Sequence, residues 1–211
     1  MVLDFTIREF ARKLAAREPA PGGGAAASYT GALGAAVAGM AVAYSIRKDE
    51  EDRARIAELA EGLDYLERLR EDLLLFTKKD SEAYGAYSEA KKLPRATEEE
   101  KAERGKRIRR ALEEALAIPL QAATSCAEGM ERLEKLTSMI SSRLVTDAGV
   151  AARCLGAACR SLWYNVHINA QALKDPRRRR ELEKLNEKTE EEITRLEAAI
   201  IARVEGKIRD G

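Results

Sequence analysis

The chain has 211 residues, and although 35% of them are charged, its formal net charge is only +1. This balance excludes the strong positive field with which proteins attract nucleic acid or acidic membranes. No linker-like change of composition divides the chain, so we expect a single domain over residues 1–211.

Cysteine and histidine are too few to build a disulfide framework or a zinc site. The chain has three cysteines, Cys126, Cys154 and Cys159, and one histidine, and it contains no Cys-x-x-Cys pair. The N-terminus lacks the basic and then apolar build of a signal peptide. We therefore expect a reduced, cytoplasmic protein without a metal site.

Helical periodicity runs along the whole chain, and no segment alternates as a strand does. Thr6 and Glu9 form a capping box for a first short helix, which ends before Pro19. Further helices are predicted over residues 25–46, about 51–92, from Thr97 to a loop at 141–146, about 147–174, and from Pro176 onward. Pro119 predicts a kink in the fourth of these six helices. The fold class is all-α, a bundle of five to six helices.

The second predicted helix is the centre of this bundle. Pro21, Gly22, Gly23 and Gly24 predict a loop whose bare backbone can approach another molecule closely. Residues 25–46 then contain no charge and few large side chains, which predicts a helix that neighbouring backbones approach closely. A membrane span is the alternative, but Ala, Gly, Ser and Thr gain little from lipid, so no membrane association is expected.

Asp80 is a carboxylate on an otherwise apolar helix face. It follows Phe76 by one helical turn, at the spacing of the leucines before it. A buried carboxylate is costly unless it is paired or hydrogen-bonded. Two interpretations remain open: an ion pair with a neighbouring helix, or a carboxyl with a raised pKa that lines a cavity and transfers protons.

Asn165 and Asn169 lie one turn apart on the apolar stripe of the fifth predicted helix. Their amides are either contacts between helices or a paired donor and acceptor edge for a planar ring rich in nitrogen. Asp147 lies on the same face, about 27 Å before Asn165 along a straight helix. Asp147 is therefore an N-terminal carboxylate of the helix, or the ligand is elongated or lies between subunits.

The order of these segments resembles the formiminotransferase-cyclodeaminase C-terminal family, which includes freestanding methenyltetrahydrofolate cyclohydrolases. The matching segments are Pro21-Gly22-Gly23-Gly24, Lys48, Asp80 with Ala83-Tyr84, Ile118-Pro119, Thr146-Asp147-Ala148-Gly149-Val150-Ala151 and Asn165-Val166-His167-Ile168-Asn169. The resemblance as a whole covers roughly residues 5 to 205.

The resemblance implies an all-helical homodimer that binds a reduced folate between helices and needs no cofactor besides this substrate. It implies Asp80 or Asp147 as the acid and base, with Lys48 as a charge or proton partner. Lys48 also suits the end of the central helix without any substrate. Asn165, Asn169 and the backbone of Pro21 and the glycine triplet would then bind the folate.

Three functions stay open at this point. A cyclohydrolase opens the methenyl bridge to 10-formyltetrahydrofolate, and it is favoured because no formiminotransferase domain accompanies the chain. A cyclodeaminase closes 5-formiminotetrahydrofolate with loss of ammonia. The third is a helical scaffold without activity, since the chain departs from the family pattern at Ala25, at His167 and in the segment Ser141 to Thr146.

Overall fold

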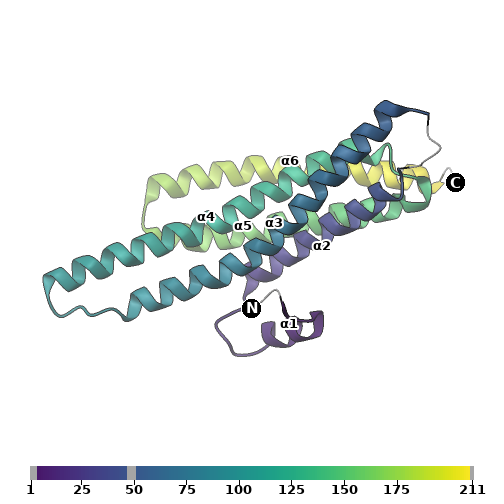
Figure 1. The fold of residues 1–211 in the computed structure, drawn as a ribbon. Helices are drawn as coiled ribbons and strands as arrows, with labels where there is room; N and C mark the ends of the chain where they lie inside the picture. Colours follow the sequence, from purple (N-terminus) through teal and green to yellow (C-terminus); the bar gives the residue numbers. More distant parts are fainter. Residues whose placement is uncertain (1–3, 47–50, 210–211) are drawn as a thin grey trace.

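The computed structural model describes residues 4–46 and 51–209, which form an all-α bundle (Figure 1). Its helices are α1 (Ile7–Leu14), α2 (Gly23–Ala43), α3 (Arg53–Lys92), α4 (Glu98–Thr137), α5 (Val145–Leu173) and α6 (Pro176–Arg209). A short 3-10 helix, η2 (Ser142–Leu144), precedes α5. No strand occurs in the described ranges, and the predicted fold class is confirmed.

Helix α2 forms the centre of the bundle and packs along α3 and α5. A Cβ at Gly34 would lie 2.9 Å from the Cβ of Cys154, so glycine is what lets α2 and α5 approach this closely. Within the described residues, α2 alone is long and apolar enough for a membrane span, but 61% of that window is buried in the bundle. This burial is typical of a helix in the core of a protein, as predicted for α2.

Helices α3 and α4 pair over most of their length, and their connected ends extend past the turn between α5 and α6 (Figure 1). Both begin at a side-chain cap. Asp52 accepts a hydrogen bond from the backbone N–H of Arg55 at 3.0 Å, and Thr97, the predicted start of its helix, forms a capping box with Glu100. The starts of both helices are thus fixed by local sequence.

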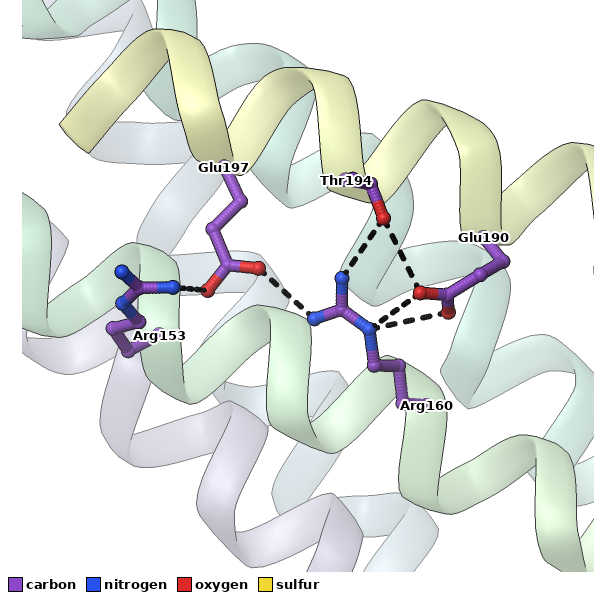
Figure 2. A network of polar contacts seen from close by, with 5 residues as sticks. All are labelled: Arg153, Arg160, Glu190, Thr194 and Glu197. Atoms are coloured by element: carbon purple, nitrogen blue, oxygen red, sulfur yellow. Dashed lines mark hydrogen bonds and ion pairs between the residues drawn. The ribbon is translucent and has the colours of Figure 1, made fainter. Parts of the chain in front are cut away.

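A buried carboxylate joins α5 to α6 (Figure 2). Glu197 of α6 is only 8% exposed, and its two oxygens accept hydrogen bonds from Arg153 at 2.7 Å and Arg160 at 3.0 Å. Arg160 also donates to Glu190 at 2.8 Å and to Thr194 at 3.2 Å. These charge-assisted bonds hold the C-terminal helix against the core.

Some predicted boundaries are wrong. Gly23 and Gly24 form the first turn of α2 instead of a loop, because the first N–H groups of a helix need no helical partner. The predicted loop at 141–146 is mostly helical, since η2 occupies part of it and α5 begins at Val145. By contrast, Pro119 lies inside α4, as predicted.

Candidate active site

A cleft of about 630 Å³ opens at the N-terminal end of α2, between α3, α4 and the last part of α5. Four segments far apart in the sequence meet there. Six of the predicted site residues line it: Gly22, Gly23, Gly24, Asp80, Asn165 and Asn169. The hollow expected beside the glycine triplet is therefore present.

Asp80 lies on α3, and its half-buried carboxylate faces the first turn of α2. The backbone N–H of Ala25 donates a hydrogen bond to Asp80, so a residue of α3 caps α2. Gly24 permits this approach, because a Cβ there would lie 2.7 Å from the Cγ of Asp80. Burial raises the pKa of Asp80 above its ordinary value of 3.8, and the Ala25 hydrogen bond offsets part of the rise. Asp80 forms no ion pair with any described residue.

The glycine triplet supplies backbone donors. The first hydrogen bond within α2 runs from the N–H of Ala26 to the carbonyl of Gly22 at 3.0 Å, so the N–H groups of Gly23 and Gly24 have no helical partner. A Cβ at Gly22 or Gly23 would meet no atom within 4 Å. Free N–H groups at the positive end of a helix suit an anionic or strongly polar oxygen of a ligand.

The two asparagines each use their amide nitrogen within the protein. Asn165 Nδ2 donates to the carbonyl of Ser161 at 3.2 Å, and Asn169 Nδ2 donates to the carbonyl of Ala115 on α4 at 2.6 Å. Neither Oδ1 accepts a hydrogen bond from a described residue. The pair therefore offers two acceptor oxygens to the cleft, one helical turn apart.

Aromatic and apolar side chains complete the lining, and the sequence analysis did not assign them to the site. Tyr84 and Tyr87 extend from α3 beyond Asp80, Leu112 comes from α4, and Ile168 lies between the two asparagines. The tyrosines follow Asp80 by four and seven residues, so helical spacing alone was a signal for them. Such side chains can cover the faces of a planar ring.

Three other predicted residues lie elsewhere or outside the description. Asp147 lies in the first turn of α5, at the end of the helix away from the cleft, and does not line it. Pro21 is buried behind the glycines and does not line the cleft either. Lys48 falls in the segment 47–50, outside the described residues.

The departures from the family pattern at Ala25 and His167 lie outside the lining of the cleft. Ala25 is fully buried, and the site uses its backbone N–H. His167 lies against the α6 side of α5, where Nε2 is 3.0 Å from Asn186 Nδ2 and the ring contacts Trp163. Neither side chain belongs to the cleft.

A second hollow, of about 680 Å³, lies between α4 and the turn from α5 to α6. Its charged residues, which include Arg109, Glu113 and Arg178, are all exposed. The first cleft is the better candidate because a half-buried carboxylate with a raised pKa, free N–H groups and amide oxygens converge there. The described residues contain no group of three or more His, Cys, Asp or Glu that could hold a metal ion.

Comparison with known proteins gives the same family as the resemblance of the sequence motifs. The family model of formiminotransferase-cyclodeaminase matches residues 6–202. The chain belongs to this family. It is 37% identical to the methenyltetrahydrofolate cyclohydrolase of Methylorubrum extorquens over 170 residues, which cover 81% of each chain.

Other members of the family have a second activity in their names. The chain is 31% identical to mouse formimidoyltransferase-cyclodeaminase over 82% of its own length, but it spans only 32% of that longer protein. The crystal structure of formiminotetrahydrofolate cyclodeaminase from Thermotoga maritima superposes with a TM-score of 0.84 and 27% identity, covering 99% of this chain and 100% of the other. The family is thus one of cyclohydrolases and cyclodeaminases in folate one-carbon metabolism.

Proposed function

We propose that this protein is a methenyltetrahydrofolate cyclohydrolase, which hydrolyses 5,10-methenyltetrahydrofolate to 10-formyltetrahydrofolate. The observation that carries the proposal is the position of Asp80, a carboxylate with a raised pKa between free backbone N–H groups and two amide oxygens. The similarity to the Methylorubrum extorquens cyclohydrolase, over most of both chains, supports the same reaction.

The pterin of the substrate fits the chemistry of the cleft. Its volume of about 630 Å³ falls within the usual range of small-molecule sites. The Oδ1 atoms of Asn165 and Asn169 suit the 2-amino group and the ring N–H of a pterin, which are adjacent donors. Tyr84 and Tyr87 supply aromatic surface for the flat ring.

The reaction needs a proton acceptor and then a proton donor. Asp80 accepts a proton from water as the water oxygen bonds to the bridge carbon, which becomes tetrahedral between N5 and N10. The bond from this carbon to N5 then breaks: N5 receives the first proton from Asp80, the remaining hydroxyl proton passes to Asp80 and on to solvent as the C=O forms, and the formyl group stays on N10. The N–H groups of Gly23 and Gly24 stabilise the oxygen as negative charge develops on it. Water and the folate are the only reactants, so the proposal includes no cofactor.

Asp80→Asn tests this role. We expect turnover, followed as the loss of methenyl absorbance, to fall by about 100- to 10,000-fold, because an amide cannot accept the proton. Asp72→Asn is the matched control, since Asp72 lies on the same helix but is exposed. Full activity of Asp80→Asn would remove Asp80 from the mechanism. No activity or folate binding in the wild type would leave a helical scaffold.

A formiminotetrahydrofolate cyclodeaminase is the second candidate, favoured by the match to the Thermotoga maritima structure over the whole chain. That reaction passes through the same tetrahedral carbon, so the same residues would serve it. Ammonia release from 5-formiminotetrahydrofolate distinguishes the two. Ammonia release at a rate equal to or above methenyl hydrolysis would make the cyclodeaminase the principal activity.

We further propose that the protein acts in the cytoplasm as a homodimer joined through the outer faces of α2 and α5. Leu33 and Met40 of α2 are 48% and 40% exposed, and Val150 and Tyr164 of α5 are exposed beside them. The outer face of α2 carries no charge. Two adjacent helices about 30 Å long present about 600 Å², close to the roughly 800 Å² per partner of a stable interface.

This dimer would give Asp147 a role. Helices α2 and α5 run antiparallel, since the cleft contains the start of α2 and the end of α5. A two-fold axis across their shared face therefore brings the start of the partner's α5 toward the cleft. In this arrangement the partner subunit's Asp147 approaches the folate.

A further inference from the structure

The hydrogen bond between Asn169 and Ala115 joins the cleft to a proline in α4. Asn169 Nδ2 donates to the carbonyl of Ala115 at 2.6 Å, and Ala115 itself lines the cleft. In an uninterrupted α-helix, this carbonyl would accept from the N–H of the residue four positions later. That residue is Pro119, which has no N–H.

The missing donor explains where the Asn169 amide points. Pro119 leaves the carbonyl of Ala115 without its helical partner, and the pyrrolidine ring crowds that carbonyl away from the helix axis. A half-buried carbonyl without a partner is costly, and Asn169 supplies the partner from α5. A carbonyl can only accept, so the amide must turn its nitrogen toward α4, and its oxygen is left for the cleft.

We propose that Pro119 is a positioning residue for substrate binding: it frees the carbonyl of Ala115, which fixes the Asn169 amide with Oδ1 presented to the ligand. The folate as ligand rests on the proposed function, whereas the orientation of the amide does not. Pro119 is itself buried and does not line the cleft. It acts through Asn169 alone.

Pro119→Ala is the direct test in the free protein. The new N–H competes for the Ala115 carbonyl, and Asn169 loses its partner. The chain has only three Asn and two Gln, so the side-chain amide region of a 15N NMR spectrum is simple. The Asn169 pair, identified by its loss in Asn169→Ala, should shift and exchange faster with solvent in Pro119→Ala. An unchanged Asn169 pair would overturn the inference, whatever the protein binds.

The second measurement is kinetic and uses methenyltetrahydrofolate. Pro119→Ala should raise KM by about 3- to 10-fold, the cost of one misplaced hydrogen bond, and leave kcat within about two-fold. In the Asn169→Ala background the same substitution should add no further rise in KM. The melting temperature of the single variant Pro119→Ala should equal or exceed that of the wild type, since a helix-interior proline is replaced by alanine.

Pro176→Ala is the matched control, because Pro176 occupies the first position of α6, where no helical N–H bond is lost. It should change neither the Asn169 signals nor KM. A KM rise of equal size in Asn169→Ala and in Asn169→Ala with Pro119→Ala supports the coupling. Independent, additive effects would overturn it. If the NMR change occurs but no variant, nor the wild type, turns over or binds the folate, the proposed function fails and the positioning role stands.

Discussion

At the scale of single residues, the absence of one side chain decides where Asp80 can lie. A Cβ at Gly24 would overlap the Asp80 carboxylate, whereas one at Gly23 meets no atom within 4 Å. Gly24→Ala is therefore expected to lower turnover at least about ten-fold, because the Asp80 carboxylate must move, and to change the unfolding free energy by less than about 1 kcal/mol, because the end of that side chain can shift.

Gly23→Ala is the control for this change, because it adds the same atoms one residue away. Urea denaturation and a turnover assay would measure both variants. Equal stability and equal activity of the two variants would show that the contact between Gly24 and Asp80 does not constrain the site.

The raised pKa of Asp80 also makes a prediction about stability. Because the folded-state pKa exceeds the unfolded value near 3.8, folding favours the protonated carboxyl. This contribution is fully present below the unfolded pKa and is lost as the pH rises through the folded-state pKa. At neutral pH the ionised carboxylate therefore destabilises the fold, and Asp80→Asn should be more stable than the wild type.

Denaturation at several pH values would check the sign. The advantage of Asp80→Asn should shrink as the pH falls toward 4, since both proteins are then uncharged at this position. The exposed control, Asp72→Asn, should show no such trend. A variant that is less stable than the wild type at neutral pH would mean that the Ala25 hydrogen bond outweighs the cost of burial.

The sequence alone predicted three of the polar residues that line the cleft, Asp80, Asn165 and Asn169. Asp80 and Asn169 were identifiable because a polar side chain interrupts a regular apolar stripe. The hydrogen bond from Asn169 to Ala115 was not identifiable. The two residues are 54 positions apart in sequence, and only the packing of α5 against α4 brings them together. The position of Asp147 at the other end of α5 agrees with the separation of about 27 Å that helical rise predicts. Periodicity gives the face and the length of a helix but not its neighbours.

At the scale of helices, the link between α5 and α6 depends on Glu197 (Figure 2). Its carboxylate accepts from Arg153 and Arg160, and both of those arginines remain partly exposed. Glu197→Gln should lower the unfolding free energy by about 1–2 kcal/mol, since two charge-assisted bonds become weaker and solvent screens what remains.

Glu192→Gln provides the comparison, because Glu192 forms only a 3.9 Å surface pair with Arg195. We expect Glu192→Gln to lower the unfolding free energy by less than about 0.5 kcal/mol. Chemical denaturation of the two variants in parallel would measure both losses of unfolding free energy. A loss for Glu197→Gln no larger than for Glu192→Gln would mean that α6 is held by its apolar contacts alone.

Helix starts were easier to predict than loops. Thr6, Thr97 and Asp175 each accept the backbone hydrogen bonds expected of a cap, because capping depends on residues that are adjacent in sequence. The predicted start of α2, at residue 25, lies two residues after the observed start at Gly23, because the cap of this helix is Asp80 from another helix. No local pattern contains that information.

At the scale of the whole molecule, the exposed apolar faces of α2 and α5 make oligomerisation testable. Leu33→Glu places a charge at the centre of the proposed interface and should convert a dimer into a monomer, measured by light scattering during gel filtration. Turnover should fall with the dimer, since the partner subunit's Asp147 would no longer reach the cleft.

Leu75→Glu is the control, because Leu75 is 41% exposed but lies on α3, away from the proposed interface. It should stay dimeric and active. Circular dichroism of both variants would separate dissociation from unfolding. A Leu33→Glu protein that is folded, monomeric and fully active would exclude a contribution of the partner to the site.

The direction of α6 has a practical consequence. The helix begins at Pro176, close to where α5 leaves the cleft, and its 34 residues extend about 50 Å to Arg209. Figure 1 places this end of the chain beside the C-terminal end of α2, opposite the glycines. A fluorophore or a surface tether attached there would lie at the end of the subunit opposite its own glycines, so it would leave that subunit's own cleft unobstructed.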